Sequence, residues 1–503
     1  MPTRKTRLLL LTIFILLQSC VVYQTPNTSP VKKSPLFRNV VQEAAYQIDT
    51  LLNNPRTDMA FWGVKIQFAN SDDVIYERNP RKLFMPASNM KLYTTAAALC
   101  LLGPQFRYET GFYSNGEVTS GTLNGDLIIK GSGDPSWSWR FYENNYDSIM
   151  VQFVDSLKAK GITRITGDIV GDDNYFDDML LGGGWAWDNE AYYYNAQLSA
   201  LSFNENYIDY KIYPDSVIGN PVRLESYPET SYLALRNDLI TVHPDSSGRW
   251  TEGRDRALNQ GWFEGEYSQS KGEGSAAITV ENPTLFTVHV LKEYLERGGI
   301  TVAGDPVDVD DLSDSLDYTG YQRLFTHQSP PLSDIICKVN KPSQNFIAET
   351  LQKTLGAEFG EEGSSYQGRL VERALFDSLG VYTPGFNPRD GSGLSRYNLI
   401  APEATVSLLD MMWDHPQREI YLASLPVIGY DGTTRRLVEN GAAYQNVLAK
   451  TGTISYARAL SGYVWTQSGE PIIFSFMVNH HTVSNTYTNA MIVEMLEILS
   501  ELP

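Results

Sequence analysis

Cysteine is scarce in this sequence, with three residues among 503, at positions 20, 100 and 337. So few thiols exclude a small fold held together by a disulfide framework. Cys100 lies in the apolar run 96–102, and Cys337 follows a pair of isoleucines, so we expect both side chains to be buried like small hydrophobic residues. The sequence leaves open whether these two cysteines pair with each other.

Histidine is also scarce, and none of the six histidines belongs to an H-E-x-x-H motif. The one adjacent pair, His480 and His481, would point to opposite faces of a strand and would not share a metal ion. The G-x-S-x-G turn of α/β-hydrolases is absent as well. These absences argue against a catalytic zinc, and we predict an enzyme with no metal and no cofactor.

Basic residues are in deficit, since 40 Lys and Arg stand against 59 Asp and Glu, for a net charge of −19. Nucleic acids and anionic membrane surfaces are bound through basic patches, so the charge argues against both partners. The hydrophobic fraction of 42% is typical of a globular protein. A chain of this length exceeds one ordinary core, so two or three domains are expected.

The amino terminus has the features of a targeting segment. A basic start is followed by the apolar stretch 8–17, which is too short to span a bilayer. It ends in Leu-Gln-Ser-Cys at 17–20, which resembles a bacterial lipobox with Cys20 as the lipidated residue; ordinary signal-peptidase cleavage nearby is the alternative. We therefore predict a signal peptide over 1–20, a tether over 21–35, and an exported periplasmic protein anchored in a membrane only by lipid.

Along the remaining chain, the hydrophobic periodicity alternates between patterns typical of helices and patterns typical of strands. Its two ends are helical and apolar, whereas about 105–318 is rich in Tyr, Trp, Gly and short alternating runs that indicate β-rich inserted modules. We expect strands at 63–69, 126–130, 447–450 and 459–464, the last two being antiparallel neighbours, and helices at 87–102, 284–298, from 332 onward and at 485–499. The first and last segments are thus predicted to form one domain that a large insertion interrupts.

Three short motifs carry the candidate chemistry. They are Ser88-Asn89-Met90-Lys91, Ser343-Gln344-Asn345 and Lys450-Thr451-Gly452-Thr453, in the order S-x-x-K, S-x-N, K-T-G. S-x-x-K also occurs at 29–32 and 268–271, and S-x-N at 202–204, so neither motif is specific alone. K-T-G occurs once. All three in order are typical of serine enzymes that are acylated by penicillin or by D-Ala-D-Ala peptides.

The residue types fit nucleophilic catalysis. Ser88 and Lys91, three apart at a helix start, share one face, and the unpaired N–H groups there suit an oxyanion. Lys91 is a base only when neutral, and the positive helix end together with Lys450 would lower its pKa. Ser343 can relay a proton to the leaving group, and Asn345 can hold the substrate amide.

The third motif is predicted to bind substrate. Thr451 and Thr453 can hold a terminal carboxylate together with Lys450, and the N–H of Thr453 can complete the oxyanion hole. Gly452 between them belongs to the same binding segment. For any one motif taken alone, the alternative is a structural serine on a helix face or in a turn. The presence of all three motifs in order argues against this alternative.

Five segments together resemble the class C penicillin-binding proteins, the D-alanyl-D-alanine carboxypeptidase/endopeptidase family that includes penicillin-binding protein 4. The resemblance covers nearly the whole mature chain, and the long insert separates it from penicillin-hydrolysing β-lactamases, which lack one. The segments are 86–91, 131–135, 340–345, 390–395 and 449–453.

The resemblance implies an α+β fold: a penicillin-recognising serine-enzyme domain with a five-stranded antiparallel sheet and a helical cluster, carrying two inserted β-rich domains. The domain boundaries that we assign on this basis are 36–105 plus 319–503 for the catalytic domain, 106–197 plus 285–318 for inserted domain II, and 198–284 for inserted domain III.

The resemblance also implies hydrolysis of D-Ala-D-Ala bonds or D-Ala–diaminopimelate cross-links in peptidoglycan stem peptides, through an acyl-enzyme on Ser88 that β-lactams inhibit. Asp172 would bind the free amino end of the substrate side chain, or would merely order its loop. The alternatives are a β-lactamase-like amide hydrolase and a non-catalytic peptidoglycan-binding lipoprotein. Carboxypeptidase against endopeptidase preference, the substrate's diamino acid and the oligomeric state stay open.

Overall fold

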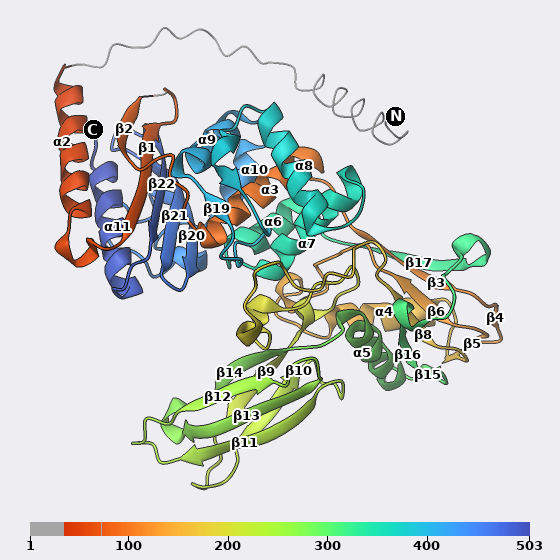
Figure 1. Ribbon diagram of the computed structural model, residues 1–503. Helices are drawn as coiled ribbons and strands as arrows, with labels where there is room; N and C mark the ends of the chain where they lie inside the picture. The colour runs from red at the N-terminus through yellow and green to blue at the C-terminus, as the bar shows by residue number, and fades with distance from the viewer. Residues whose placement is uncertain (1–34, 72) are drawn as a thin grey trace.

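The computed structural model describes residues 35–71 and 73–503, and the two ends of this chain share one five-stranded sheet (Figure 1). The strand order is β2-β1-β22-β21-β20, and every neighbouring pair is antiparallel, which confirms the predicted sheet. The strands are β1 Phe61–Phe68, β2 Val74–Arg78, β20 Val447–Ile454, β21 Ala457–Trp465 and β22 Pro471–Asn479.

Helices cover both faces of this sheet, so its central strand is buried on both sides. All nine residues of β22 are buried, and they alternate between two cores: Phe474 packs with α2 and α11, while Ile473 packs with the helices of the opposite face. Helices α2 and α11 lie together on one side of the sheet in Figure 1. Their bounds are α2 Pro35–Leu52 and α11 Asn485–Ser500.

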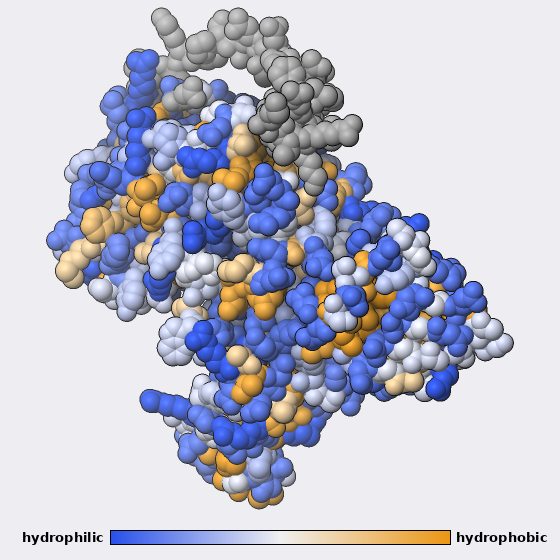
Figure 2. All heavy atoms as spheres, turned by 45° about the vertical axis from the view of Figure 1, so that its right-hand side comes forward, coloured by the Kyte–Doolittle hydropathy of each residue, from blue (hydrophilic) through white to orange (hydrophobic). Residues whose placement is uncertain are grey.

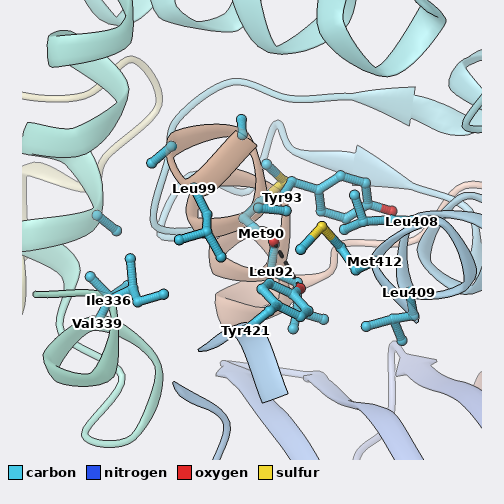
Figure 3. Packing of buried hydrophobic residues seen from close by; sticks show 14 of the residues in the cluster. Met90, Leu92, Tyr93, Leu99, Ile336, Val339, Leu408, Leu409, Met412 and Tyr421 are labelled. Carbon is cyan, nitrogen blue, oxygen red and sulfur yellow. Dashed lines mark hydrogen bonds between the residues drawn. The ribbon is translucent and has the colours of Figure 1, made fainter. Parts of the chain in front are cut away.

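Helix α3, Met90–Leu101, is the centre of the helical cluster on the other face. Its apolar side chains pack among residues of α6, α9 and α10, and the Tyr421 hydroxyl donates a hydrogen bond of 3.0 Å to the carbonyl of Leu92 (Figure 3). The cluster comprises α6 Leu332–Asn340, α7 Asn345–Phe359, α8 Ser365–Ser378, α9 Pro402–Asp414 and α10 Arg418–Ser424, with a short ribbon of β18 Phe386–Asn387 and β19 Leu399–Ile400. Being buried all round, α3 is a fixed platform for whatever stands at its start.

The start of this helix differs from the expectation. A helix over 87–102 was predicted, but Ala87–Asn89 form a 3-10 turn and the α-helix begins only at Met90. Ala87 has φ +47°, a left-handed conformation that costs a non-glycine residue about 1–3 kcal/mol. Such strain is held in place by surrounding structure and is concentrated at functional sites.

Residues 105–331, here called the middle body, separate the two halves of the sheet-bearing part, here called the outer body. The middle body contains four sheets, ordered β16-β8-β6-β3-β17, β15-β7-β5-β4, β10-β9-β14 and β11-β13-β12, and its own hydrophobic core drawn from residues 112–324. These four sheets are additional to the five-stranded sheet of the outer body.

The bounds in the middle body are as follows: β3 Glu109–Ser114, β4 Val118–Thr119, β5 Thr122–Leu123, β6 Leu127–Lys130, α4 Ser148–Ala159, β7 Arg164–Ile165, β8 Ile169–Asp172, β9 Tyr207–Tyr213, β10 Arg223–Tyr227, β11 Ala234–Val242, β12 Trp250–Arg254, β13 Gln260–Ser268, β14 Gly274–Thr279, α5 Pro283–Arg297, β15 Thr301–Val302, β16 Pro306–Asp308 and β17 Gln322–Gln328. Strand β17 pairs with β3 along 322–328, so we count these residues in the middle body.

The cysteines are less buried than expected. Both thiols are half-buried, Cys337 is a free thiol, and no disulfide joins it to Cys100. The Cys337 thiol donates to the carbonyl of Ser333 at 3.3 Å, and the Cys100 sulfur lies 3.5 Å from Nε2 of His415. Helix positions near the cluster's rim explain the exposure, since apolar neighbours in sequence do not bury every side of a helix.

The predicted signal peptide over 1–20 with Cys20, and the tether to residue 34, lie outside the described residues. Within 35–71 and 73–503, no helix combines the length and the apolar character that crossing a bilayer requires. Hydrophilic side chains cover most of the face in Figure 2, with hydrophobic residues in separate patches between them, as the net charge of −19 would suggest.

Candidate active site

The first motif places a lysine against a serine at the start of α3. Lys91 is fully buried, and its Nζ lies 3.0 Å from Oγ of Ser88, 2.7 Å from Oδ1 of Asn345 and 2.7 Å from the carbonyl oxygen of Ser392. A neutral amine in this position has two N–H groups for the two carbonyl-type acceptors. Its lone pair is then left for the Ser88 hydroxyl, which is the arrangement that a general base needs.

The third motif places a second lysine beside the second serine. Lys450 on β20 is also fully buried, and its Nζ donates to Oγ of Ser343 at 2.7 Å and to the carbonyl of Thr451 at 2.9 Å. The three motifs, separated by hundreds of residues in sequence, therefore form two linked pairs: Ser88 with Lys91 and Ser343 with Lys450. Asn345 joins the second motif to the first.

The two lysines have lowered pKa values. Burial lowers the pKa of Lys91 to about 7, although the negative charges of Glu349 and Asp390 act to raise it. Burial, and then the positive charge of Lys91, hold the pKa of Lys450 well below its usual range. Burial is thus the main cause, whereas the sequence-based explanation was a second cation and a helix end.

Asn89, the second residue of the first motif, connects α3 to the sheet. Its Nδ2 donates to the carbonyl of Lys450 at 2.7 Å, and its Oδ1 accepts from the hydroxyl of Ser461 on β21 at 2.8 Å. A buried amide satisfied on both sides fixes the distance between the helix start and β20. The sequence analysis gave Asn89 no role, and its place between Ser88 and Lys91 was the only signal.

Two glycines allow the chain segments of the site to approach one another. A Cβ on Gly452 would lie 2.4 Å from the carbonyl oxygen of Pro86, so β20 can pass this closely only without a side chain. Gly393, at φ +87°, approaches the carbonyl of Ala87, where a Cβ would lie at 1.8 Å. The K-T-G glycine therefore has a packing reason beside any contact with substrate.

Glu349, which the sequence analysis missed, holds the carbonyl that receives Lys91. This buried carboxylate accepts from the backbone N–H of Ser392 at 2.7 Å and of Gly391 at 3.1 Å. The hydroxyl of Thr94 donates to the carbonyl of Gly391 at 2.8 Å. Glu349 lies one helical turn after Asn345 on α7, so an i, i+4 glutamate was the available signal.

Asp390 organises the rest of the same loop. Its buried carboxylate accepts from the N–H of Gly393 at 2.8 Å and from the indole N–H of Trp185 at 2.9 Å. Ser395, in a run that resembled the family signature, donates its hydroxyl to the carbonyl of Gly183. The loop therefore connects the outer body to the middle body and forms one wall of the site.

The second motif begins α7 from a strained residue. Ser343 has φ +64°, Gln344 caps the helix with its side-chain oxygen, and Asn345 donates through Nδ2 to the carbonyl of Tyr194 at 2.8 Å. Tyr194 belongs to the middle body, so that body contributes a hydrogen bond directly to the motif.

The threonines of the third motif lie toward solvent. Thr453 is exposed, and Arg458 donates a hydrogen bond to its hydroxyl. The Thr451 hydroxyl is half-buried and lies 2.6 Å from that of Thr433. They stand on β20, at the edge of the sheet, where an incoming ligand can reach them.

Asp172 has a different environment. It is 4% exposed, and its carboxylate accepts from Asn174 through Nδ2 at 2.8 Å and from the Tyr318 hydroxyl. Both of its oxygens are occupied within the middle body, which favours the loop-ordering alternative over substrate binding. The reason is that the strand end at 169–172 is paired on both sides, with β6 and β16.

Among the described residues, the competing S-x-x-K match at 268–271 is not brought to the site. The Ser268 hydroxyl accepts from the N–H of Ser270, and the ammonium of Lys271 stands over the ring of Tyr267, all within the middle body. The match at 29–32 lies outside the described residues.

The described residues contain one group of carboxylates spaced for a cation, namely Asp173, Asp308 and Asp310, whose oxygens lie within 4.8 Å of one another. Asp173 already accepts from Ser199 and Thr284.

A serine in contact with a buried lysine of lowered pKa, opposite a second serine and lysine on the edge of a five-stranded sheet, defines the class of active-site-serine peptidases that form acyl-enzymes. The D-Ala-D-Ala carboxypeptidase 3 (S13) family matches residues 44–501. The chain belongs to this family, and it is a serine-type D-Ala-D-Ala carboxypeptidase similar to penicillin-binding protein 4.

Individual relatives are similar to this chain over most of its length. A D-alanyl-D-alanine carboxypeptidase from Actinomadura sp. (strain R39) is 32% identical over 458 residues, covering 88% of this chain and 81% of its own length. The carboxypeptidase DacB of Haemophilus influenzae is 26% identical, with 83% and 85% covered. The crystal structure of penicillin-binding protein 4 from H. influenzae aligns with a TM-score of 0.76 at 23% identity, over 90% of this chain and 97% of that chain.

Proposed function

We propose that Ser88 is the nucleophile and Lys91 the general base of this carboxypeptidase. The observation that carries the proposal is the Nζ of Lys91, fully buried and 3.0 Å from the Ser88 hydroxyl. Neutral Lys91 takes the hydroxyl proton while Oγ attacks the carbonyl carbon of the penultimate D-Ala. The N–H groups of Ser88 and Thr453 stabilise the resulting oxyanion.

The leaving amine needs a proton, and Ser343 is suited to deliver it. Its hydroxyl accepts from Lys450 at 2.7 Å, so a proton can pass from the lysines through the hydroxyl to the nitrogen as the C–N bond breaks. Terminal D-Ala then leaves, an ester remains on Ser88, and water hydrolyses it. Asn345, already bonded to Lys91, would orient the amide of the substrate.

Lys450 has a second task, because Thr451, Gly452 and Thr453 present a site for the terminal carboxylate. A bound carboxylate would favour the charged form of Lys450, whose pKa is otherwise lowered by burial and by Lys91. Repulsion between two cations is mutual, so charged Lys450 would in turn favour neutral Lys91. Substrate binding would thereby prepare the base.

β-Lactams are proposed to acylate Ser88 and to leave slowly. A homologue, penicillin-binding protein 4 of H. influenzae, has been crystallised with a novel β-lactam. Glu349 has both carboxylate oxygens engaged by backbone N–H groups, so it is unsuited to activate a deacylating water. Rapid turnover of β-lactam would contradict this proposal and favour the β-lactamase-like alternative.

Fluorescent penicillin tests the nucleophile. We expect wild-type protein to be labelled and the Ser88→Ala variant, at the same concentration and with an unchanged melting temperature, to take no label. Labelling that persists in Ser88→Ala would contradict the assignment. No labelling of either protein would favour a non-catalytic peptidoglycan-binding role.

Substrate preference is proposed to include both terminal D-Ala removal and cleavage of cross-links, since both use the same acyl-enzyme. Purified pentapeptide monomers and cross-linked dimers, incubated with the enzyme and analysed by mass, separate the two activities. Loss of one D-Ala from monomers is the expected product, and intact monomers with cleaved dimers would indicate an endopeptidase alone.

The domain division and location complete the proposal. Sheets β10-β9-β14 and β11-β13-β12, within 198–284, support inserted domain III, and the other two sheets of the middle body support inserted domain II.

Export to the periplasm and a lipid anchor on Cys20 are tested by fractionation. We expect Cys20→Ala to move the enzyme from the membrane fraction to the soluble periplasmic fraction.

A further inference from the structure

The middle body reaches the second motif through one buried carboxylate, that of Glu205. Gln344, between Ser343 and Asn345, is 4% exposed, and its Nε2 donates a hydrogen bond to Oε2 of Glu205. The oxygen of the same Gln344 side chain accepts from the N–H of Phe346 at 3.3 Å and so caps α7. One amide therefore connects the helix start to Glu205.

Glu205 is itself held firmly. Its fully buried carboxylate accepts from Nε of Arg140 at 2.5 Å, from the Ser138 hydroxyl at 2.7 Å and from the Tyr207 hydroxyl at 3.1 Å. These donors, which include the guanidinium of Arg140, satisfy the hydrogen-bonding capacity of the buried carboxylate, and the amide N–H of Gln344 completes the set. Glu205 is thus a rigid anchor point on the middle body.

Backbone strain is present on both sides of this contact. Asn204, Glu205 and Asn206 have φ values of +48°, +55° and +61°, and Ser343 has φ +64°. Non-glycine residues in this left-handed region are strained and persist only where other contacts hold them. Asn206 donates to the carbonyl of Gln197 at 2.8 Å and supplies such a contact. The strained turn directs the Glu205 side chain toward Gln344.

We propose that Glu205 is a positioning residue for the acyl-serine reaction: by holding Gln344, the middle body fixes the Ser343–Asn345 segment against Lys450 and Lys91. Both neighbours of Gln344 in the motif contact a site lysine: Ser343 accepts from Lys450 and Asn345 accepts from Lys91, each at 2.7 Å. A shift of Gln344 would therefore displace both contacts. This inference rests on the proposed roles of the motif residues. It gives the insertion a part in the chemical step as well as any part in binding substrate.

The variant that isolates the contact is Gln344→Met, which keeps the volume of the side chain and leaves the Glu205–Arg140 pair intact. We expect acylation by fluorescent penicillin to slow by about 10- to 100-fold, the range seen when reacting groups are displaced by up to 1 Å. For a D-Ala-D-Ala peptide, kcat should fall by a similar factor while KM changes little, because the displaced groups act in the chemical step.

The matched control is Lys353→Met, two helical turns further along α7. Buried Lys353 also connects α7 to the middle body, through Oδ1 of Asp177 at 2.6 Å and the carbonyl of Met179 at 2.9 Å, but it bonds no motif residue. We expect Lys353→Met to lower the melting temperature at least as much as Gln344→Met while leaving the acylation rate within about threefold of wild type. A purely structural role for Gln344 predicts that the two variants behave alike.

An exchange of the two side chains provides the decisive comparison. Gln344→Glu sets two carboxylates against each other and should slow acylation more than Gln344→Met does. Adding Glu205→Gln restores one donor and one acceptor and leaves a single carboxylate in the pair, now at position 344, so we expect the double variant to regain about tenfold in rate. The absence of any such recovery, or a wild-type rate for Gln344→Met, would overturn the proposal. A wild-type chain that takes no label would contradict the proposed role of Ser88 as well, so the two failures are distinguishable.

Discussion

The outer and middle bodies differ in where their buried polar groups lie. In the outer body, Asn89, Glu349 and Asp390 are buried, and each is hydrogen-bonded to at least one other segment of the chain. The core of the middle body is apolar, mostly aliphatic with packed aromatic rings among it, such as Phe153 against Phe112 at 4.8 Å and against Trp137 at 4.5 Å between centroids. Its strained polar turn at 204–206 adjoins the second motif.

This difference indicates a division of labour. Apolar packing inside the core of the middle body gives stability but little geometric precision, because the hydrophobic effect is non-directional. Hydrogen bonds to buried carboxylates and amides fix direction and distance, which the placement of Lys91 and Lys450 requires. Substitutions in the two bodies should therefore separate activity from stability.

Removal of Lys91 should have the largest effect on activity. We expect Lys91→Met to slow acylation by about 10³-fold, since general-base catalysis contributes roughly 10²–10⁴. The measurement is the second-order rate of labelling by fluorescent penicillin. An equally large loss in a middle-body variant of normal stability would contradict the division between the two bodies.

A lower pH should also slow acylation, as the removal of Lys91 does. Lys91 works as a base only when neutral, and burial lowers its pKa from 10.5 to about 7. The acylation rate should therefore fall about tenfold per unit as pH drops below 7 and level off above it, giving roughly 100-fold between pH 5 and 8. A rate independent of pH over 5–8, in protein that stays folded, would show that Lys91 is not the titrating base.

Glu349→Gln should slow acylation less than Lys91→Met does, and it should also change the pH dependence of the rate. One of the two backbone N–H groups of the 391–392 segment loses its acceptor, so acylation should slow by about 10- to 30-fold. Burial, and then the charge of Asp390, raise the pKa of Glu349 itself to about 7, so only part of its charge is present where Lys91 titrates. Because that charge raises the pKa of Lys91, its removal should also move the acidic limb of the pH profile to lower pH, by a small amount.

The control for this variant is Glu372→Gln. Glu372 is equally buried and accepts from Gln352 at 3.0 Å, and burial raises its pKa to about 8, so it is mostly protonated at neutral pH and glutamine mimics it well. We expect a pH profile like that of wild type. If Glu372→Gln shifts the profile as much as Glu349→Gln does, the effect is a general one of burial and not of the contact with the loop.

Phe153→Ala should have the smallest effect on activity. Loss of the ring from the core of the middle body should cost about 3–5 kcal/mol of unfolding free energy, measured by denaturant. Acylation at a temperature where the variant is folded should change by less than about threefold. A much larger loss of rate would show that packing inside the middle body also governs the second motif.

Much of the outer fold was predictable because its signals are local. The alternating runs at 63–69 and 459–464 predicted strands, and the ordered motifs predicted which side chains would meet, which the Lys91–Ser88 and Lys450–Ser343 contacts agree with. The prediction missed the 3-10 turn at 87–89, because a left-handed alanine is imposed by neighbouring segments and not by its own preference.

The sequence alone determined the family, the order of the motifs and the presence of a large β-rich insertion, because each is written in adjacent residues or in segment composition. Tertiary structure alone decided the state of the two lysines, since burial rather than a nearby charge is the main cause of their lowered pKa values. It also decided the roles of Glu349, Asn89 and Glu205, and the internal bonding of Asp172. The physical reason is that burial and hydrogen-bond partners arise from segments far apart in sequence, which no local pattern records.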